Sequence, residues 1–219
     1  MGDPLGVDGR AIATPTLPAS AAIQKIRGQE QSLPLDCESR SAVDWAGYFG
    51  VKIDELEFFH KLPVSNDPNL GFVGNVRGSW GNLPPNAYGV YAGPVAQLLR
   101  GYGMDAYAYR GMTWDQLRAE VAAGRPVIVW VVGHVSRSTP VTMTVTGGGE
   151  ILAAKYEHTV IFVGYDEKHA AVLDGSVRYA VPFDVFLTSW GTLGNMAVVD
   201  RVLPTQPDCA RNAVELVPQ

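Results

Sequence analysis

The chain has 219 residues, of which 47% are hydrophobic and 18% charged, with a formal net charge of −5. These values are typical of a globular protein and exclude a disordered chain, while the scattered lysines and arginines argue against a nucleic-acid partner. The longest apolar run, residues 126–133, is far shorter than the ~20 residues that cross a bilayer, so no membrane span is expected. The two cysteines exclude a disulfide framework and a four-cysteine zinc site.

The length suits one domain with short appendages. Residues 1–22 are rich in Gly, Pro, Ala and Thr without apolar periodicity, which is typical of a linker or N-terminal arm. Residues 204–219 form a proline-rich C-terminal tail around Cys209, for which we expect no role. The domain itself is expected over residues 23–203. A disulfide from Cys209 to Cys37 is the alternative, and sequence alone does not show whether the two sulfurs meet.

Helical spacing dominates the first half of the domain. A helix over residues 37–49 follows Asp36 as N-cap and ends before Gly50, which places Cys37 in its first turn. Residues 63–89 are dominated by Gly, Pro and Asn, which predicts a long loop of the kind that usually carries function. Further helices are expected over residues 54–62, 91–102 and 113–123.

Strand patterns dominate the second half. Residues 126–132 form a continuous, mostly β-branched run that predicts a buried strand. Residues 133–155 combine Thr and Val alternation with a triple glycine at 147–149, which predicts a hairpin or a flap above a cleft. Helices followed by strands favour an α+β fold, a helical lobe packed on an antiparallel sheet. Further strands are expected over residues 158–164, 170–174 and 195–199.

Cys37 is the candidate nucleophile. The first turn of a helix favours negative charge, which lowers the pKa of a thiol placed there. Asp36 and Glu38 oppose this effect because they place negative charge beside the sulfur. We therefore expect a histidine nearby to stabilise the thiolate.

Among the four histidines, His158 is the one that we expect to lie beside a carboxylate. A turn centred near Asp166 would fold the two flanking strands into a hairpin and set His158 opposite Asp174, with Phe162 opposite Ala170. A one-residue slip would turn Asp174 to the other face. A carboxylate on one ring nitrogen leaves the other free to take the thiol proton, so we predict a Cys37, His158 and Asp174 triad.

Further residues are candidates for substrate contact. Trp80 lies in the glycine-rich loop, Tyr91 begins a helix and Trp130 lies in the buried strand. Large aromatic residues usually belong to the core, but we expect part of this set to bind substrate. His134, just after a strand, is the reserve base. Gln29 or Gln31, just before the first helix, could supply an amide donor for an oxyanion.

Several short blocks follow one another along the chain: Gln29, Leu33-Pro34, Cys37-Glu38, Tyr48 to Lys52, Gly71 to Gly74, Tyr88 to Tyr91, Gly124 to Trp130, Glu157-His158 and Gly164 to Asp166. In this order they resemble the C39-like branch of the papain-like cysteine peptidases. The resemblance covers about residues 29–199 and implies a papain-like cysteine proteinase fold, hydrolysis of a peptide or amide through Cys37, His158 and Asp174, and Gln29 at the family's glutamine, with Gln31 as fallback. This chemistry requires no cofactor, and the sequence indicates no metal site.

The chain departs from this pattern at three places. Asp36 stands where a glycine is usual, Gly175 stands where a proline is common, and the insert at residues 134–155 has no familiar pattern. Two alternatives therefore stay open: a non-catalytic binding module on the same fold, or an acyltransferase or transpeptidase that uses the same triad. An extracytoplasmic or secreted location is expected only by analogy with the family.

Overall fold

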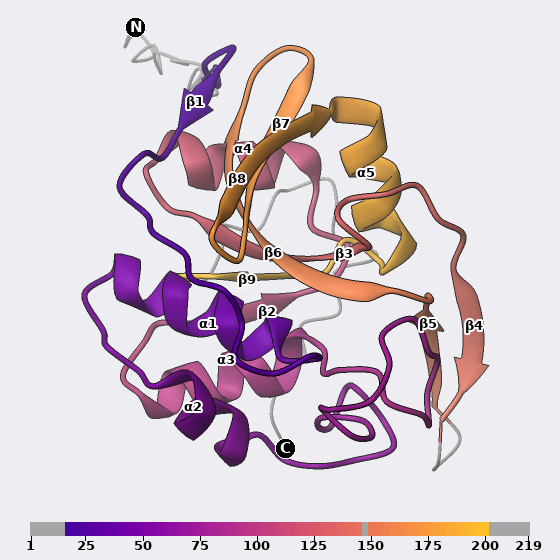
Figure 1. The fold of residues 1–219 in the computed structure, drawn as a ribbon. Coiled ribbons are helices and arrows are strands. Elements are labelled where there is room, and N and C mark those ends of the chain that lie inside the picture. Colours follow the sequence, from indigo (N-terminus) through magenta and orange to yellow (C-terminus); the bar gives the residue numbers. More distant parts are fainter. Residues whose placement is uncertain (1–15, 146–148, 202–219) are drawn as a thin grey trace, which may run out of the picture.

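A seven-stranded antiparallel sheet runs through the protein in the order β2-β9-β3-β6-β7-β8, with β1 paired to β6 (Figure 1). The computed structural model describes residues 16–145 and 149–201. Strands β4 and β5 form a separate two-stranded hairpin. The strands are β1 (Ala21–Ala22), β2 (Tyr107–Tyr109), β3 (Val127–Val132), β4 (Val141–Thr144), β5 (Glu150–Ala153), β6 (Glu157–Tyr165), β7 (His169–Asp174), β8 (Val177–Pro182) and β9 (Ala197–Val199).

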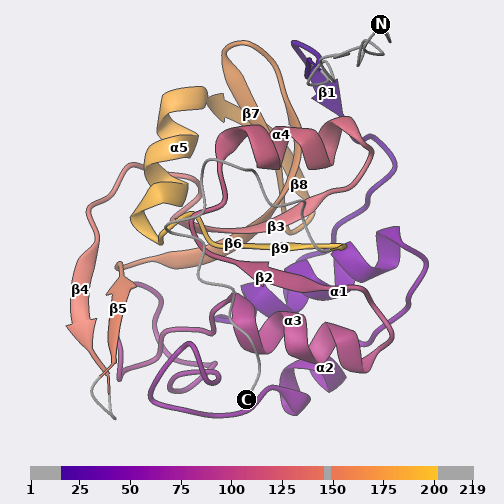
Figure 2. The ribbon, with the colours of Figure 1, turned by 180° about the vertical axis from the view of Figure 1, so that it is seen from behind.

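Helices cover both faces of the sheet, as the front and back views show (Figures 1 and 2). Helices α1 (Cys37–Tyr48), α2 (Glu55–Lys61) and α3 (Ala92–Gly101) lie on one face of the sheet, and helices α4 (Trp114–Ala122) and α5 (Phe183–Thr192) lie on the opposite face. Every residue of β3 and β6 is buried because these central strands are covered on both faces.

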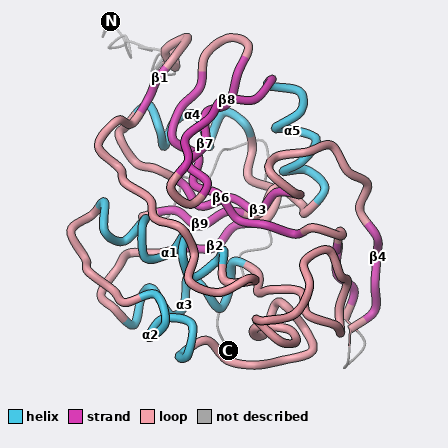
Figure 3. Tube along the Cα trace, in the orientation of Figure 1, coloured by secondary structure: helices cyan, strands magenta, loops and turns pink. Residues whose placement is uncertain are grey.

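This architecture confirms the predicted α+β class. The four expected helices are present within one or two residues of their predicted ends, and Thr113 forms a full capping box with Gln116. The predicted hairpin in the insert corresponds to β4 and β5. The long loop at residues 62–91 contains neither helix nor strand and lies beside that hairpin (Figure 3).

Three elements between residues 100 and 200 were missed by the sequence patterns. Strand β2 has only three residues, and β8 is mostly exposed, so neither shows the apolar run of a buried strand. Helix α5 has no side-chain cap and contains aromatic residues, Val, Thr and Gly191, all of modest helix propensity. It forms because Phe186 and Trp190 are fully buried against the sheet.

A buried ion network ties the segment before α1 to the helical group. The Arg40 guanidinium forms ion pairs with Asp44 and Glu55, and all three side chains are buried. Glu55 also accepts hydrogen bonds from the Ser32 backbone N–H and hydroxyl, both at 2.7 Å. The network therefore fixes the chain just ahead of Cys37.

None of the helices in the described ranges is long and apolar enough to cross a membrane. Several expectations fall outside the described residues: Cys209, the tail at 204–219, the first fifteen residues of the arm, and Gly147 and Gly148. The last two residues of the predicted arm form β1, which pairs with the end of β6.

Candidate active site

Cys37 is the first residue of α1, as predicted, and it is only 8% exposed. Asp36 occupies the N-cap position, but its side chain makes no capping hydrogen bond, which corrects the expected cap. Its carboxyl group is buried instead, and burial raises the pKa of Asp36 to about 8. The start of α1 is therefore set by packing and by the helix backbone rather than by a carboxylate cap.

The Cys37 thiol lies 3.4 Å from the Glu38 carboxylate oxygen Oε2, to which it donates a hydrogen bond. Burial, followed by the charges of Glu38 and Glu157, raises the pKa of the thiol well above its usual value. This ground state holds a neutral thiol. The helix dipole was expected to lower the thiol pKa and the acidic neighbours to raise it. In the structure, burial and the acidic neighbours outweigh the helix dipole.

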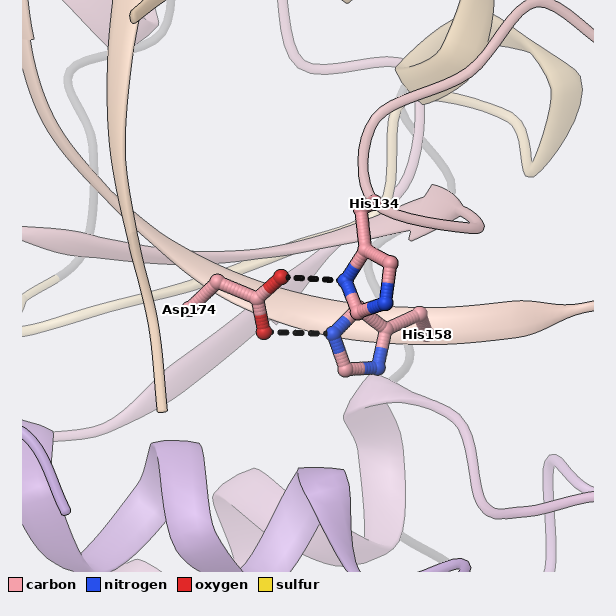
Figure 4. Close-up of side chains that lie close together, drawn as sticks. All are labelled: His134, His158 and Asp174. Atoms are coloured by element: carbon pink, nitrogen blue, oxygen red, sulfur yellow. Dashed lines mark hydrogen bonds and ion pairs between the residues drawn. The ribbon is translucent and has the colours of Figure 1, made fainter. Parts of the chain in front are cut away.

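His158 and Asp174 form a close pair. His158 Nε2 lies 2.7 Å from Asp174 Oδ1, and the other ring nitrogen, Nδ1, points away from the carboxylate (Figure 4). Asp174 Oδ2 also accepts a hydrogen bond from the Tyr179 hydroxyl at 2.9 Å and lies 2.8 Å from His134 Nδ1. Burial opposes ionisation of Asp174, but the hydrogen bonds and charge of His158, with those from His134 and Tyr179, lower its pKa to about 2.

The predicted register of the hairpin is corrected by two residues. Phe162 pairs with Val172 rather than with Ala170, and a bulge interrupts the ladder between Phe162 and Gly164. Because side chains alternate with a period of two, a two-residue shift keeps Asp174 on the face of His158. The contact between His158 and Asp174 is therefore present, although the two residues are not paired directly opposite each other as predicted.

Cys37 and His158 line one pocket, whose cavity volume is about 240 Å³. Trp80 forms part of its wall: its indole N–H donates to the Glu157 carbonyl at 2.9 Å, and its ring centre lies 5.8 Å from that of His158. His134, the reserve base of the sequence analysis, lies on the exposed rim, bound to Asp174. The full lining is Gln31, Pro34, Leu35, Cys37, Trp80, Tyr88, His134, Glu157 and His158.

Gln31, rather than Gln29, lies in the pocket wall. Gln29 is exposed, and its backbone N–H donates to Asp44 Oδ2 at 3.0 Å. The Gln31 side-chain amide donates to the backbone carbonyls of Leu33 and Pro34, at 2.8 and 2.9 Å. The structure thus corrects the predicted position of the glutamine, and Gln31 would have to release these carbonyls to bind an oxyanion.

Two of the three aromatic residues expected at the substrate lie in the core instead. Trp130 is fully buried, and its indole N–H donates to the Val90 carbonyl at 2.9 Å. Tyr91 is 1% exposed, and its hydroxyl donates to the Leu152 carbonyl at 2.7 Å. Both faces of the sheet are covered here, which a one-dimensional pattern does not reveal. Of that set, the pocket is lined only by Trp80.

Sequence reasoning missed the role of two residues. Tyr179 lies on β8, and the alternation of Val177, Tyr179 and Val181 is the signal that could have located it. Glu157 was noted only as the neighbour of His158, yet it lines the pocket and is 2% exposed. Among the described residues, two groups of side chains bring potential metal-ligand atoms within 4.8 Å of one another: His134, His158 and Asp174, and Cys37, Glu38 and Glu157.

Residues 23–198 match the model of the Peptidase_C39 like family, which covers most of the chain. The chain belongs to this family. The C39-like chain is 28% identical over 175 residues to the uncharacterized protein YvpB of Bacillus subtilis, with 74% of this chain and 68% of YvpB covered. The family is peptidase-like, which agrees with the resemblance seen in the sequence blocks.

One solved structure confirms the fold. A protein from Bacillus anthracis named "putative C39-like peptidase" superposes with a TM-score of 0.73 at 24% identity, over 85% of this C39-like chain and 99% of that protein. Xylellain, a cysteine protease from Xylella fastidiosa, gives a TM-score of 0.45 at 14% identity, with 86% and 88% covered. The first of these two likenesses shows that the α+β architecture described above is the fold of a C39-like peptidase, as predicted.

Proposed function

We propose that this protein is a cysteine-dependent peptidase or amidase in which Cys37 is the nucleophile, His158 the base and Asp174 the group that orients the histidine. The observation that carries the proposal is that Cys37 and His158 line one pocket while Asp174 holds the far ring nitrogen of His158 at 2.7 Å. That hydrogen bond fixes the tautomer and leaves Nδ1 to accept the thiol proton.

The reaction would begin with a change of partner for the thiol. Cys37 leaves the Glu38 oxygen by rotation of its side chain and gives its proton to His158 Nδ1. The thiolate attacks the carbonyl carbon of a peptide or amide bound beside Trp80, and the imidazolium then gives its proton to the leaving amine. Water, activated by the same imidazole, releases the acyl group from sulfur.

The oxyanion of each tetrahedral intermediate needs two donors. The backbone N–H of Cys37, at the first position of α1, is one of the groups that a helix leaves unpaired. The Gln31 amide, in the wall of the same pocket, is the second candidate once it releases the Leu33 and Pro34 carbonyls. Replacement of Gln31 by alanine should lower kcat by about 100-fold or more while KM changes little.

The test is thiol reactivity together with turnover of fluorogenic peptide and amide substrates. Iodoacetamide should modify Cys37 much faster than Cys209, and His158→Gln should remove this difference. Cys37→Ala should abolish turnover, whereas Cys209→Ala is the matched control that should retain it. Equal, slow labelling of both thiols with no turnover of any substrate would overturn the proposal. Added amines distinguish hydrolysis from acyl transfer through the products that form.

A second function is favoured by one observation, the hydrogen bond from Cys37 to Glu38. A thiol held neutral in this way suits a binding module that uses the pocket without chemistry. In that case peptides would bind with equal affinity to the wild type and to Cys37→Ala, and the wild type would leave them intact over long incubation.

A further inference from the structure

Glu38 and Glu157 form an acidic cluster with Cys37 beside the pocket, which Cys37 and Glu157 both line. Glu38 comes from the first turn of α1 and Glu157 is the first residue of β6; the two are 1% and 2% exposed. One ligand atom from each of the three side chains lies within 4.8 Å of the other two. The cluster thus joins the helix that carries the thiol to the strand that carries His158.

The negative charge of this cluster has no counter-charge among the described residues. Neither glutamate forms an ion pair within residues 16–145 and 149–201. Both carboxylate oxygens of Glu157 are buried and lack any hydrogen-bond partner in this part of the chain. Burial of a carboxylate is costly unless it gains a proton or a cation, so the cluster demands one or the other.

The surrounding backbone is shaped to hold these carboxylates. The Val90 N–H donates to Glu38 Oε1 at 2.6 Å, which leaves Oε2 facing the Cys37 sulfur. Gly89, at φ +148°, packs so closely that a Cβ there would lie 2.2 Å from Glu38 Oε1 and 2.6 Å from Glu157 Oε2. An oriented and hydrogen-bonded carboxylate is the arrangement that metal ligands usually show.

Thiolate and carboxylate together are a donor set for Zn²⁺, which binds Cys sulfur at about 2.3 Å and carboxylate oxygen at about 2.0–2.2 Å. Ligand atoms around a tetrahedral zinc are then about 3.5 Å apart. Cys37 Sγ and Glu38 Oε2 already lie 3.4 Å apart, and no pair of ligand atoms in the cluster is separated by more than 4.8 Å. Cys37 and Glu157 both line the pocket, which provides the route of entry and a free side for a water ligand. Mg²⁺ and Ca²⁺ prefer all-oxygen sites and fit less well.

The neighbouring group of His134, His158 and Asp174 is the weaker candidate. Its members already satisfy one another, because Asp174 takes a hydrogen bond from each imidazole as well as from Tyr179. A cation there would break contacts that exist. In the glutamate cluster it would instead supply contacts that Glu157 lacks.

We propose that Cys37, Glu38 and Glu157 form a binding site for Zn²⁺ or a similar thiophilic divalent cation. Binding forms a Zn–S bond and breaks the S–H bond, and the proton leaves to solvent. The consequence for activity rests on the proposed function: a sulfur bound to zinc is not available for attack on a carbonyl, so zinc acts as a reversible inhibitor. The site itself does not depend on that function.

The experiment measures binding to the full chain in a Cys209→Ala background, so that one thiol remains. Zn²⁺ affinity is measured by calorimetry, and Co²⁺ serves as a probe because a Co–thiolate bond gives a charge-transfer absorption band. We expect one Zn²⁺ per chain, the cobalt band, and a loss of affinity of at least about tenfold in Glu157→Gln. His134→Asn is the matched control and should retain the affinity of the parent.

The outcomes separate the two proposals. Zinc binding by a protein that cleaves no substrate supports the site, and cleavage without zinc binding at micromolar concentration overturns it. Unchanged affinity in Glu157→Gln, or a loss confined to His134→Asn, also overturns it. If Glu157→Gln does not fold, as judged by circular dichroism, Cys37→Ser serves instead, because it leaves both carboxylates in place; retention of full zinc affinity by Cys37→Ser would overturn the site equally.

Discussion

Replacement of Asp174 by asparagine removes the charge that the two imidazoles share while it keeps the shape of the side chain. In the wild type this carboxylate accepts hydrogen bonds from His158, His134 and Tyr179, at 2.7 to 2.9 Å. Asparagine can accept through one oxygen only. We therefore expect Asp174→Asn to lower the free energy of unfolding at neutral pH.

The size of the effect follows from the pKa of Asp174, which is lowered from 3.8 to about 2. Each pKa unit corresponds to about 1.36 kcal/mol, so the full shift is worth about 2 kcal/mol. Solvent at the pocket rim screens part of this, which leaves about 1–2 kcal/mol. Because the folded pKa is below the unfolded value, this stability is complete above pH 4 and is lost as the pH falls through 2.

The assay is urea denaturation followed by tryptophan fluorescence, for the wild type and for Asp174→Asn, at several values between pH 7 and pH 2. The difference in unfolding free energy should be about 1–2 kcal/mol at pH 7 and should shrink toward zero at pH 2. Asp184→Asn is the control, because Asp184 is exposed and its ion pair with Arg137 lies at the surface. Its effect should stay within about 0.5 kcal/mol.

Two results would refute this reasoning. A difference for Asp174→Asn that stays constant from pH 7 to pH 2 would mean that packing, not charge, is what the substitution disturbs. A difference no larger than that of Asp184→Asn would mean that the carboxylate gains nothing from its three partners. Either result would also remove the physical basis for assigning Asp174 the orienting role.

Three further substitutions test how much the residues that surround the pocket contribute to the stability of the fold. Arg40→Met should lower the free energy of unfolding by about 3–5 kcal/mol in urea, because it leaves two buried carboxylates without a counter-charge. Gly89→Ala should cost more than about 1 kcal/mol, seen as a lower thermal midpoint, since its Cβ would lie 2.2 Å from a Glu38 oxygen. Trp130→Phe should cost about 1–3 kcal/mol in urea, because the buried Val90 carbonyl loses its donor.

The sequence predicted those features that depend on local pattern. Apolar spacing and caps located α1 to α4, and the apolar run at residues 127–132 located a central strand. The pairing of His158 with Asp174 was also predictable, because both lie on strands joined by a short turn. A two-residue error in register did not matter, since it preserved the face on which the side chains lie.

Features that depend on packing in three dimensions were not predictable. Burial of Trp130 follows from helices on both faces of the sheet, and burial of Tyr91 follows from its contacts with Tyr88 and with Leu152 of β5; no single strand pattern reveals either. The direction of the Cys37 thiol depends on Gly89 and Val90, which hold Glu38 from a distant loop. Tyr179 reaches Asp174 only because β8 pairs along β7.

Cys37 and His158 line one pocket but lie far apart in the sequence, on α1 and on β6, and Asp174 and Tyr179, the partners of the imidazole, follow on β7 and β8. During synthesis the helix emerges long before those strands. In the mechanism proposed above, a nascent chain would therefore hold the nucleophile before its base, and activity would arise only after β6 to β8 are made.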